Sequence, residues 1–185
     1  MNSQLLSMDN DDQIEKLPVL PSEKFQEVDG GAAITDDGHL VRYCFRTLNK
    51  YPIVYGSNRY TTGTHEIRFR IDKRGELRSF VGIIASSERV SRVISIETDN
   101  KSLYGWWGLN IFVKNGKTQR IPEKTDLEKS EDITFIIKCD QHQIQLEHRR
   151  TKRLLQLSID PSTCPFPWRV VVELTSYGDW ARILQ

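Results

Sequence analysis

Apolar and polar residues alternate strictly along residues 65–72. Ile67, Phe69 and Ile71 fall on one side of an extended chain, whereas the residues between them are charged. Because successive side chains of a β-strand point to opposite faces, this pattern predicts a strand with one buried and one solvent-facing side. Residues 65–72 therefore predict one strand of a sheet that covers an apolar core.

Short runs rich in β-branched and aromatic residues recur along the chain, separated by clusters of Gly, Asn, Asp and Lys. They comprise residues 80–84, 90–96, 109–113, 133–137, 143–148, 154–159 and 169–174. Asn115-Gly116 follows one of these runs and is typical of a hairpin turn. Apolar spacing typical of a helix is confined to residues 123–129. The pattern predicts an all-β fold, an antiparallel two-sheet β-sandwich of the jelly-roll type.

The first 31 residues have a different composition. They contain few aromatic residues and many acids, and Pro18 and Pro21 keep a short segment extended. Such a composition buries too little apolar surface to offset the entropy of ordering. We predict a disordered, acidic arm over residues 1–31 and a sandwich domain over residues 32–185. Alternatively, the Leu-Pro-Val-Leu-Pro run at 17–21 docks along the body or in a groove of a partner.

The overall charge hides an asymmetry between the first 37 residues and the rest of the chain. The chain holds 26 Lys and Arg residues against 25 Asp and Glu residues, a net charge of +1. Residues 1–37 hold nine acids and two lysines, a net charge of −7, which leaves 24 basic and 16 acidic residues, or +8, in the remainder. The opposite charges favour a contact between arm and body that salt would weaken.

The cysteines and the N-terminus bear on compartment and cofactors. Cys44, Cys139 and Cys164 are widely spaced and form no Cys-x-x-Cys pair, so neither a zinc site nor a disulfide framework is indicated. His142 and His148 would lie about 20 Å apart along a strand, too far to share one ion. No secretory signal and no apolar run of about 20 residues is present. We expect a cytoplasmic protein with no metal, no cofactor and no membrane association.

One pair of acids is a candidate for catalysis. Glu97 and Asp99 would lie on one face of a strand, as the two carboxylates of a glycosidase must flank one bond. Residues 99–101 are also typical of a turn, which favours the interpretation that Glu97 and Asp99 are exposed to solvent and have no catalytic role. No nucleophile elbow, phosphate loop or dinucleotide fingerprint is present. We expect the protein to have no enzymatic activity. The alternative function is that of a carbohydrate-binding or carbohydrate-cleaving β-sandwich.

The basic tract at residues 148–153 is a candidate for contacting phosphates. It lies between two predicted strands, where a charged turn serves solubility, and only His148 offers a ring for stacking. We therefore do not expect nucleic acid to be the partner.

Aromatic residues gather at predicted turns, within residues 50–64, 104–108, 165–168 and 177–180. Trp and Tyr in loops give a large contact area with few rotatable bonds, which is typical of recognition surfaces. A sandwich core also needs large rings, so we expect about half of them to be buried.

Five short segments resemble, in order, those of a SPRY domain. They are residues 34–38, 60–67, 80–83, 104–106 and 164–168. The chain departs from the family pattern at residues 130–132, which replace a Gly-Asp pair, and at 149–153, which replace an Asn-Gly turn. Residues 32–185 are thus similar to a SPRY domain, an antiparallel β-sandwich of protein-interaction modules.

The resemblance implies a non-enzymatic protein–protein interaction module, a monomeric adaptor that recognises a peptide or protein through loops at one end of the sandwich. It assigns partner binding to the loop before Gly63 and to the aromatic turn, which comprises residues 104–107. The assigned residues are Tyr55, Asn58, Arg59, Tyr60, Tyr104, Trp106 and Trp107. Tyr60 and Tyr104 would provide ring contacts, while Arg59 would pair with an acid or a backbone carbonyl of the ligand.

Overall fold

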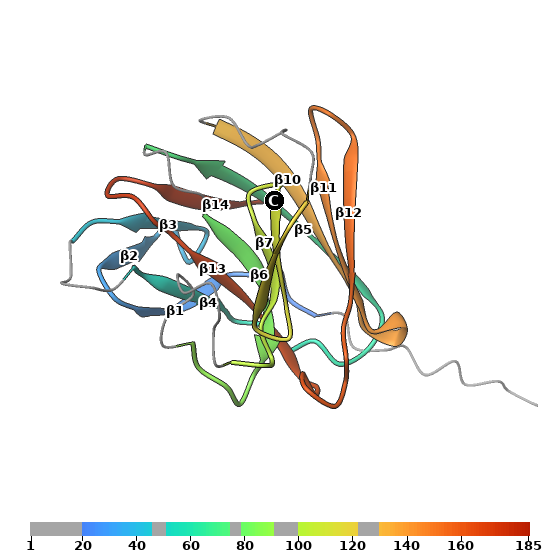
Figure 1. Cartoon of the computed structure of the whole chain (residues 1–185). Coiled ribbons are helices and arrows are strands. Elements are labelled where there is room, and N and C mark those ends of the chain that lie inside the picture. Colours follow the sequence, from blue (N-terminus) through green and yellow to red (C-terminus); the bar gives the residue numbers. More distant parts are fainter. Residues whose placement is uncertain (1–19, 46–50, 75–78, 91–99, 122–129) are drawn as a thin grey trace, which may run out of the picture.

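The computed structural model describes residues 20–45, 51–74, 79–90, 100–121 and 130–185. Within these ranges the chain forms two seven-stranded antiparallel sheets (Figure 1). Sheet A has the order β1 (Phe25–Asp29), β4 (Ile53–Gly56), β13 (Trp168–Glu173), β6 (Phe80–Ala85), β7 (Tyr104–Trp107), β8 (Ile111–Lys114), β9 (Lys117–Arg120). Sheet B has the order β12 (Arg153–Ser158), β11 (Gln143–His148), β10 (Ser130–Lys138), β5 (Thr64–Asp72), β14 (Trp180–Leu184), β3 (Leu40–Tyr43), β2 (Ala32–Thr35). A 3-10 turn, η1 (Cys139–Gln141), connects β10 to β11.

The strand patterns explain this arrangement. Ile67, Phe69 and Ile71 of β5 are buried, as their alternation with charged residues predicts. Asn115 and Gly116 connect β8 to β9 with φ angles of 53° and 71°, which a two-residue hairpin turn requires. The predicted all-β, two-sheet sandwich is confirmed.

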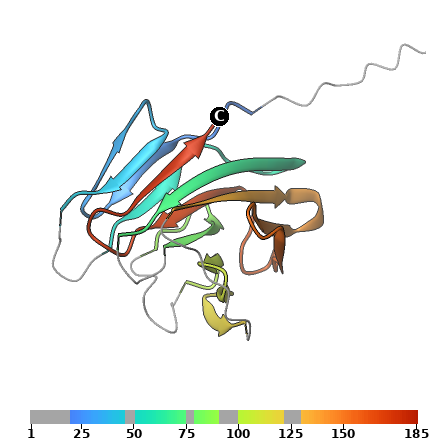
Figure 2. The same ribbon diagram turned by 90° about the horizontal axis from the view of Figure 1, so that it is seen from above.

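The main core lies between the two layers, which Figure 2 shows from above. Phe69 and Phe135 of sheet B and Trp106 and Trp168 of sheet A are among its fully buried side chains. The Trp106 ring packs edge-on against Phe135, with ring centroids 6.2 Å apart. Large rings thus fill the space between the sheets.

Sheet A carries a second apolar cluster, which we call the outer cluster. It is formed by Ile53, Tyr55, Phe80, Ile84, Val90, Leu103, Val113 and Val171. Because neighbouring residues of these strands, such as Val54 and Val170, belong to the main core, the outer cluster lies on the opposite side of sheet A. Sheet A is therefore covered on both faces.

The sandwich begins earlier than the predicted boundary at residue 32. β1 pairs with β4, and Phe25 is buried with its ring stacked on Phe69 at 6.3 Å. Glu27 and Asp29 alternate with core-facing residues here, so a strand lies inside a segment whose composition predicted disorder. Residues 1–19 of the predicted arm lie outside the described residues, as do most of the predicted strand at 90–96 and the predicted helical turn at 123–129.

None of the described residues forms a helix long and apolar enough to cross a membrane.

Candidate functional site

The loop after β4 is held by the carboxylate of Glu23. The backbone amides of Ser57 and Asn58 donate hydrogen bonds to its Oε1 at 2.8 and 3.1 Å, and the Tyr60 hydroxyl donates to its Oε2 at 2.6 Å. Burial raises the pKa of Tyr60 far above its ordinary value, and the neighbouring carboxylate raises it further. Asn58 and Tyr60 are buried, which corrects the prediction that the Tyr60 ring is presented to a partner.

The aromatic turn is strand β7, and its alternation decides which rings are accessible. Tyr104 and Trp106 point into the main core and are buried, whereas Trp107 packs half-buried against Phe80 on the other face, at 5.4 Å between ring centroids. The Tyr104 hydroxyl lies 2.9 Å from the Thr163 hydroxyl. Tyr104 and Trp106 are thus core residues, and the predicted partner contacts of both are corrected.

Tyr55 lies in the outer cluster, where two guanidinium groups flank its ring. The guanidinium carbons of Arg169 and Arg89 lie 4.4 and 5.0 Å from the ring centroid, within the range of cation–π contacts. The Tyr55 hydroxyl accepts a hydrogen bond from the Val90 amide at 3.0 Å. Tyr55 is itself 1% exposed. Its ring therefore packs against these arginines and does not contact a partner directly.

Glu27 connects the two arginines. Its Oε2 lies 3.0 Å from the Arg169 guanidinium and 2.9 Å from that of Arg89. Although partial desolvation acts to raise the pKa of Glu27, hydrogen bonds from Arg169 and then Arg89 hold it below its ordinary value. Burial is also the main reason why the pKa of Arg169 is lowered. One carboxylate therefore fixes two guanidinium groups over one aromatic ring.

Arg59 completes this group from the loop after β4. One of its terminal nitrogens donates to the carbonyls of Gly56, Ser57 and Asn58 at 3.0 to 3.3 Å, so Arg59 braces its own loop. Its positive charge lies close enough to lower the pKa of Arg169, after burial and despite Glu27. We call Glu27, Tyr55, Arg59, Arg89 and Arg169 the Tyr55 cluster.

The structure separates the predicted partner-binding residues into two groups. Tyr55, Asn58, Arg59 and Tyr60 belong to β4 and its loop, and the other three belong to β7. Five of the seven are buried, and only Arg59 and Trp107 are half-exposed. Among the ten rings at the predicted aromatic turns, five are buried, as expected.

The predicted site lacks three members of the Tyr55 cluster, namely Glu27, Arg89 and Arg169. Arg169 has a sequence signal, because it is the one charged residue within the apolar run 168–172 of a central strand. A charge at such a position needs a buried partner. Glu27 and Arg89 have no comparable signal, since both lie in polar surroundings in the sequence.

Within the basic tract at 148–153, residues 149–152 are exposed, whereas the residue at each end is less accessible. His148 is buried, and its Nε2 lies 2.8 Å from the Glu131 carboxylate. Arg149, Arg150 and Lys152 line a cavity of about 420 Å³.

The other chemical candidates lead to no site within the described residues. Glu97 and Asp99 lie outside them. Burial raises the pKa of the Cys139 thiol to about 11 and that of Cys164 to about 12, so neither is a thiolate nucleophile at neutral pH. All three cysteines are free, and the described residues contain no group of three or more His, Cys, Asp or Glu side chains placed to hold a metal ion.

Comparison with known proteins identifies the fold. No protein-family model and no curated protein sequence matches the chain. Among solved structures, the PSpry domain of TRIM65 is similar over 89% of this chain and 90% of its own length, with a TM-score of 0.66 and 13% identity. The SPRY domain of human HERC1 is similar over 87% of this chain and 97% of its own, with a TM-score of 0.64 and 13% identity.

A third similar structure, stonustoxin, has a TM-score of 0.58 and 9% identity over 87% of this chain and 27% of its own. The chain therefore has a SPRY-like fold, which confirms the resemblance seen in the sequence. At these identities the likeness concerns the fold, so residue roles must come from the geometry of this chain.

Proposed function

We propose that this SPRY-like sandwich is a non-enzymatic protein-interaction module, and that it recognises a peptide or protein partner through the Tyr55 cluster at the loops beside β4. The observation that carries the proposal is the arrangement of two arginines, Arg89 and Arg169, over a buried tyrosine ring, with Glu27 as the carboxylate that bridges them. Arginine is one of the residue types that, with tryptophan and tyrosine, dominate the energetics of protein interfaces.

The cluster is organised in advance of binding. Arg169 is fixed by burial and by Glu27, and Arg59 is held by three carbonyls of its own loop. Little side-chain entropy is then lost when a partner binds, which favours affinity. The side chains of Arg89 and Glu27 are 56% and 42% exposed, so a partner can reach both.

The charge of the cluster indicates the chemistry of the contact. Arg59, Arg89 and Arg169 contribute three positive charges, and Glu27 with the nearby Asp29 contributes two negative ones. Planar guanidinium groups donate in pairs to carboxylates and to backbone carbonyls. The proposed ligand is therefore a peptide segment that offers such acceptors. Trp107 lies on the same face of sheet A and offers an apolar contact further along it.

The remaining parts of the proposal concern the cellular role. We propose that the protein is a monomeric, cytoplasmic adaptor that works without a cofactor. Its three free cysteines support a reducing compartment such as the cytoplasm. The inert thiols of Cys139 and Cys164 support a role without covalent catalysis.

A peptide selection tests the proposal. Peptides enriched on the wild-type protein from a random library are synthesised, and their affinities are measured by fluorescence anisotropy. We expect the double variant Arg59→Ala, Arg89→Ala to bind at least about 10-fold more weakly, because both guanidinium groups are lost while Arg169 still fills the sheet face.

The matched control is Lys117→Ala, Arg120→Ala, which removes two exposed charges from β9 at the far edge of sheet A. Its affinity should stay within about twofold of wild type. Equal losses in both double variants, with both proteins folded, would reject the Tyr55 cluster as the contact. Failure to enrich any peptide would reject peptide recognition.

A further inference from the structure

A row of one leucine and three charged residues crosses the outer face of sheet B. Leu40, Arg182, Arg70 and Asp132 are successive Cα partners on β3, β14, β5 and β10. The Arg149 amide then donates to the Asp132 carbonyl at 3.2 Å, which brings the turn after β11 to the end of the row. Neighbouring residues such as Val41, Phe69 and Ile183 belong to the main core, so this row lies on the opposite, solvent-facing side.

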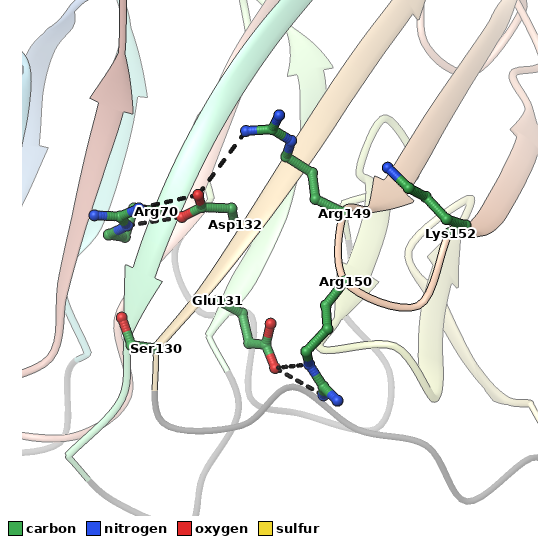
Figure 3. Close-up of a pocket in the computed structure, with 7 residues that line it drawn as sticks. All are labelled: Arg70, Ser130, Glu131, Asp132, Arg149, Arg150 and Lys152. Carbon is green, nitrogen blue, oxygen red and sulfur yellow. Dashed lines mark hydrogen bonds and ion pairs between the residues drawn. The ribbon is translucent and has the colours of Figure 1, made fainter.

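One end of the row opens into the cavity of about 420 Å³ that Figure 3 shows. It is lined by Arg70, Ser130, Glu131, Asp132, Arg149, Arg150 and Lys152. Its volume suits one or two polar side chains of a partner. Since its lining consists of charged residues and one serine, an apolar ligand would leave these groups without partners.

Both carboxylates of the cavity are engaged by cations of its walls. Asp132 accepts two hydrogen bonds from Arg70, at 2.7 and 3.0 Å. Glu131 accepts two from Arg150, at 3.2 and 2.9 Å, and lies 2.8 Å from the buried His148 ring. In Figure 3 the Arg150 side chain points toward Glu131 across the cavity. The acids are therefore neutralised within the wall.

Two cations remain in excess. The cavity lining holds four basic and two acidic side chains, a net charge of +2. The Lys152 ammonium has no ion-pair partner within the described part of the chain, and Arg149 lies 4.0 Å from Asp132, beyond hydrogen-bond distance. The Arg149 side chain is 47% exposed. An anionic group in the cavity would meet both.

A second cavity, of about 190 Å³, lies at the other end of the row. It is lined by Leu40, Arg42, Arg74, Trp180 and Arg182. Arg182 is paired with Asp36, whereas the guanidinium groups of Arg42 and Arg74 have no carboxylate partner among the residues that the structure describes. Trp180 and Leu40 supply an apolar wall, so this cavity combines cations with an aromatic surface.

We propose that the outer face of sheet B is a second binding surface, which takes an acidic segment of a protein partner in extended conformation. Its carboxylate or phosphate groups enter the cavity beside Arg149 and Lys152 and approach Arg42 and Arg74 at the other end of the row. This surface is separate from the Tyr55 cluster, which lies on the outer face of sheet A.

The spacing of the two cavities fits such a ligand. β3 and β10 are three strand positions apart in sheet B, or roughly 14 Å at the usual distance between strands. Residues i and i+4 of an extended peptide lie about 13 Å apart on the same side. Two acidic residues at this interval therefore reach both cavities.

Acidic residues on the same face favour a peptide over a nucleic acid. Asp72 of β5 lies two residues from Arg70 on this face, and Glu66 lies on the same face beyond Arg68. A polynucleotide carries a charge at every nucleotide and would be repelled where it passes these carboxylates. A peptide can place its charges only where the cations are.

Fluorescence anisotropy with labelled model ligands tests the inference. The probes are hexaglutamate, a phosphoserine peptide of the same length, and a single-stranded oligonucleotide of the same charge. We expect both peptides to bind, and the stronger of them identifies carboxylate or phosphate as the preferred group. Affinity should fall between about 0.05 M and about 0.15 M salt, because the contacts are ionic.

Two double variants locate the contact. Arg149→Gln, Lys152→Gln should weaken peptide binding at least about 10-fold. The control Lys117→Gln, Arg120→Gln removes the same charge from β9 and should leave affinity within about twofold. Equal losses would show non-specific attraction and overturn the inference. So would absence of peptide binding, or tighter binding of the oligonucleotide than of both peptides.

A third variant separates this inference from the proposed function. If Arg59→Ala, Arg89→Ala abolishes binding of the acidic peptides while Arg149→Gln, Lys152→Gln does not, the acidic segment binds at the Tyr55 cluster, and the second surface is rejected while the first stands. Thermal unfolding of every variant establishes that the fold is retained.

Discussion

Arginine side chains lie on the outer faces of both sheets, but only sheet A buries one. Arg169 is 1% exposed, stacks on Tyr55 and pairs with Glu27. Arg70 of sheet B makes two hydrogen bonds to Asp132 while 47% of its side chain remains exposed. The outer cluster removes water from Arg169, whereas no such cluster covers Arg70 within the described residues. Burial therefore decides how much each ion pair contributes to the stability of the fold.

The largest expected effect concerns Arg169. Its replacement by alanine removes both the packing against Tyr55 and the cation that Glu27 requires, so we expect a loss of about 3 kcal/mol in the free energy of unfolding. Arg70→Ala should lower that free energy by less than about 1 kcal/mol, because water replaces most of the exposed contact. Urea denaturation of both variants measures the difference, and similar losses for both would contradict it.

A second prediction concerns Glu173, which lies at the end of β13. It is 1% exposed, and its Cα partners Ile53 and Phe80 belong to the outer cluster. One carboxylate oxygen has no hydrogen-bond partner, and burial raises the pKa of Glu173 well above 4.5. The unfolded chain releases this proton above about pH 4.5 while the folded chain keeps it, so stability falls as pH rises from there.

Replacement of Glu173 by methionine should remove this pH dependence. We expect the free energy of unfolding to rise by about 1 to 2 kcal/mol at pH 7 and by less at pH 4, where both states hold the proton. Glu66→Met, on the exposed face of β5, is the matched control and should show no such difference. A variant that is less stable than wild type at pH 7 would mean that the Glu173 carboxylate has a partner.

The smallest effect concerns the exposed pair on sheet B. The hydrogen bonds from Arg70 lower the pKa of Asp132 below its ordinary value of 3.8, despite partial desolvation. Stability from this pair is present above pH 3.8 and is lost as pH falls through the folded-state pKa. An NMR titration should show the Asp132 carboxyl returning toward 3.8 in Arg70→Ala. An unchanged pKa would assign the shift to Arg149 instead.

The fold was predictable from the sequence wherever one face of a strand is apolar. The alternation of β5 and the Asn115-Gly116 turn both led to the observed elements. Strand β1 was missed, because Phe25 and Val28 are its only apolar positions and the acids around them suggested a disordered segment. Local composition cannot show that β4 pairs with this segment.

The site was less predictable than the fold. Tyr60 and Tyr104 lie in Gly-rich segments that resemble loops, yet their hydroxyls find partners in distant parts of the chain, at Glu23 and Thr163. Such long-range hydrogen bonds allow a tyrosine to be buried, and no local pattern reveals them. Arg169 could have been found from its place in an apolar strand, but its pairing with Glu27 depends on how β1, β4 and β13 align in sheet A.

The most direct test of the proposed function is NMR mapping of the wild-type protein with a peptide selected on it. We predict that the largest amide and side-chain shifts occur at Arg59, Arg89 and Arg169, with smaller ones at Trp107. Shifts confined to β8 and β9, at the far edge of sheet A, or to the outer face of sheet B would contradict partner recognition by the Tyr55 cluster.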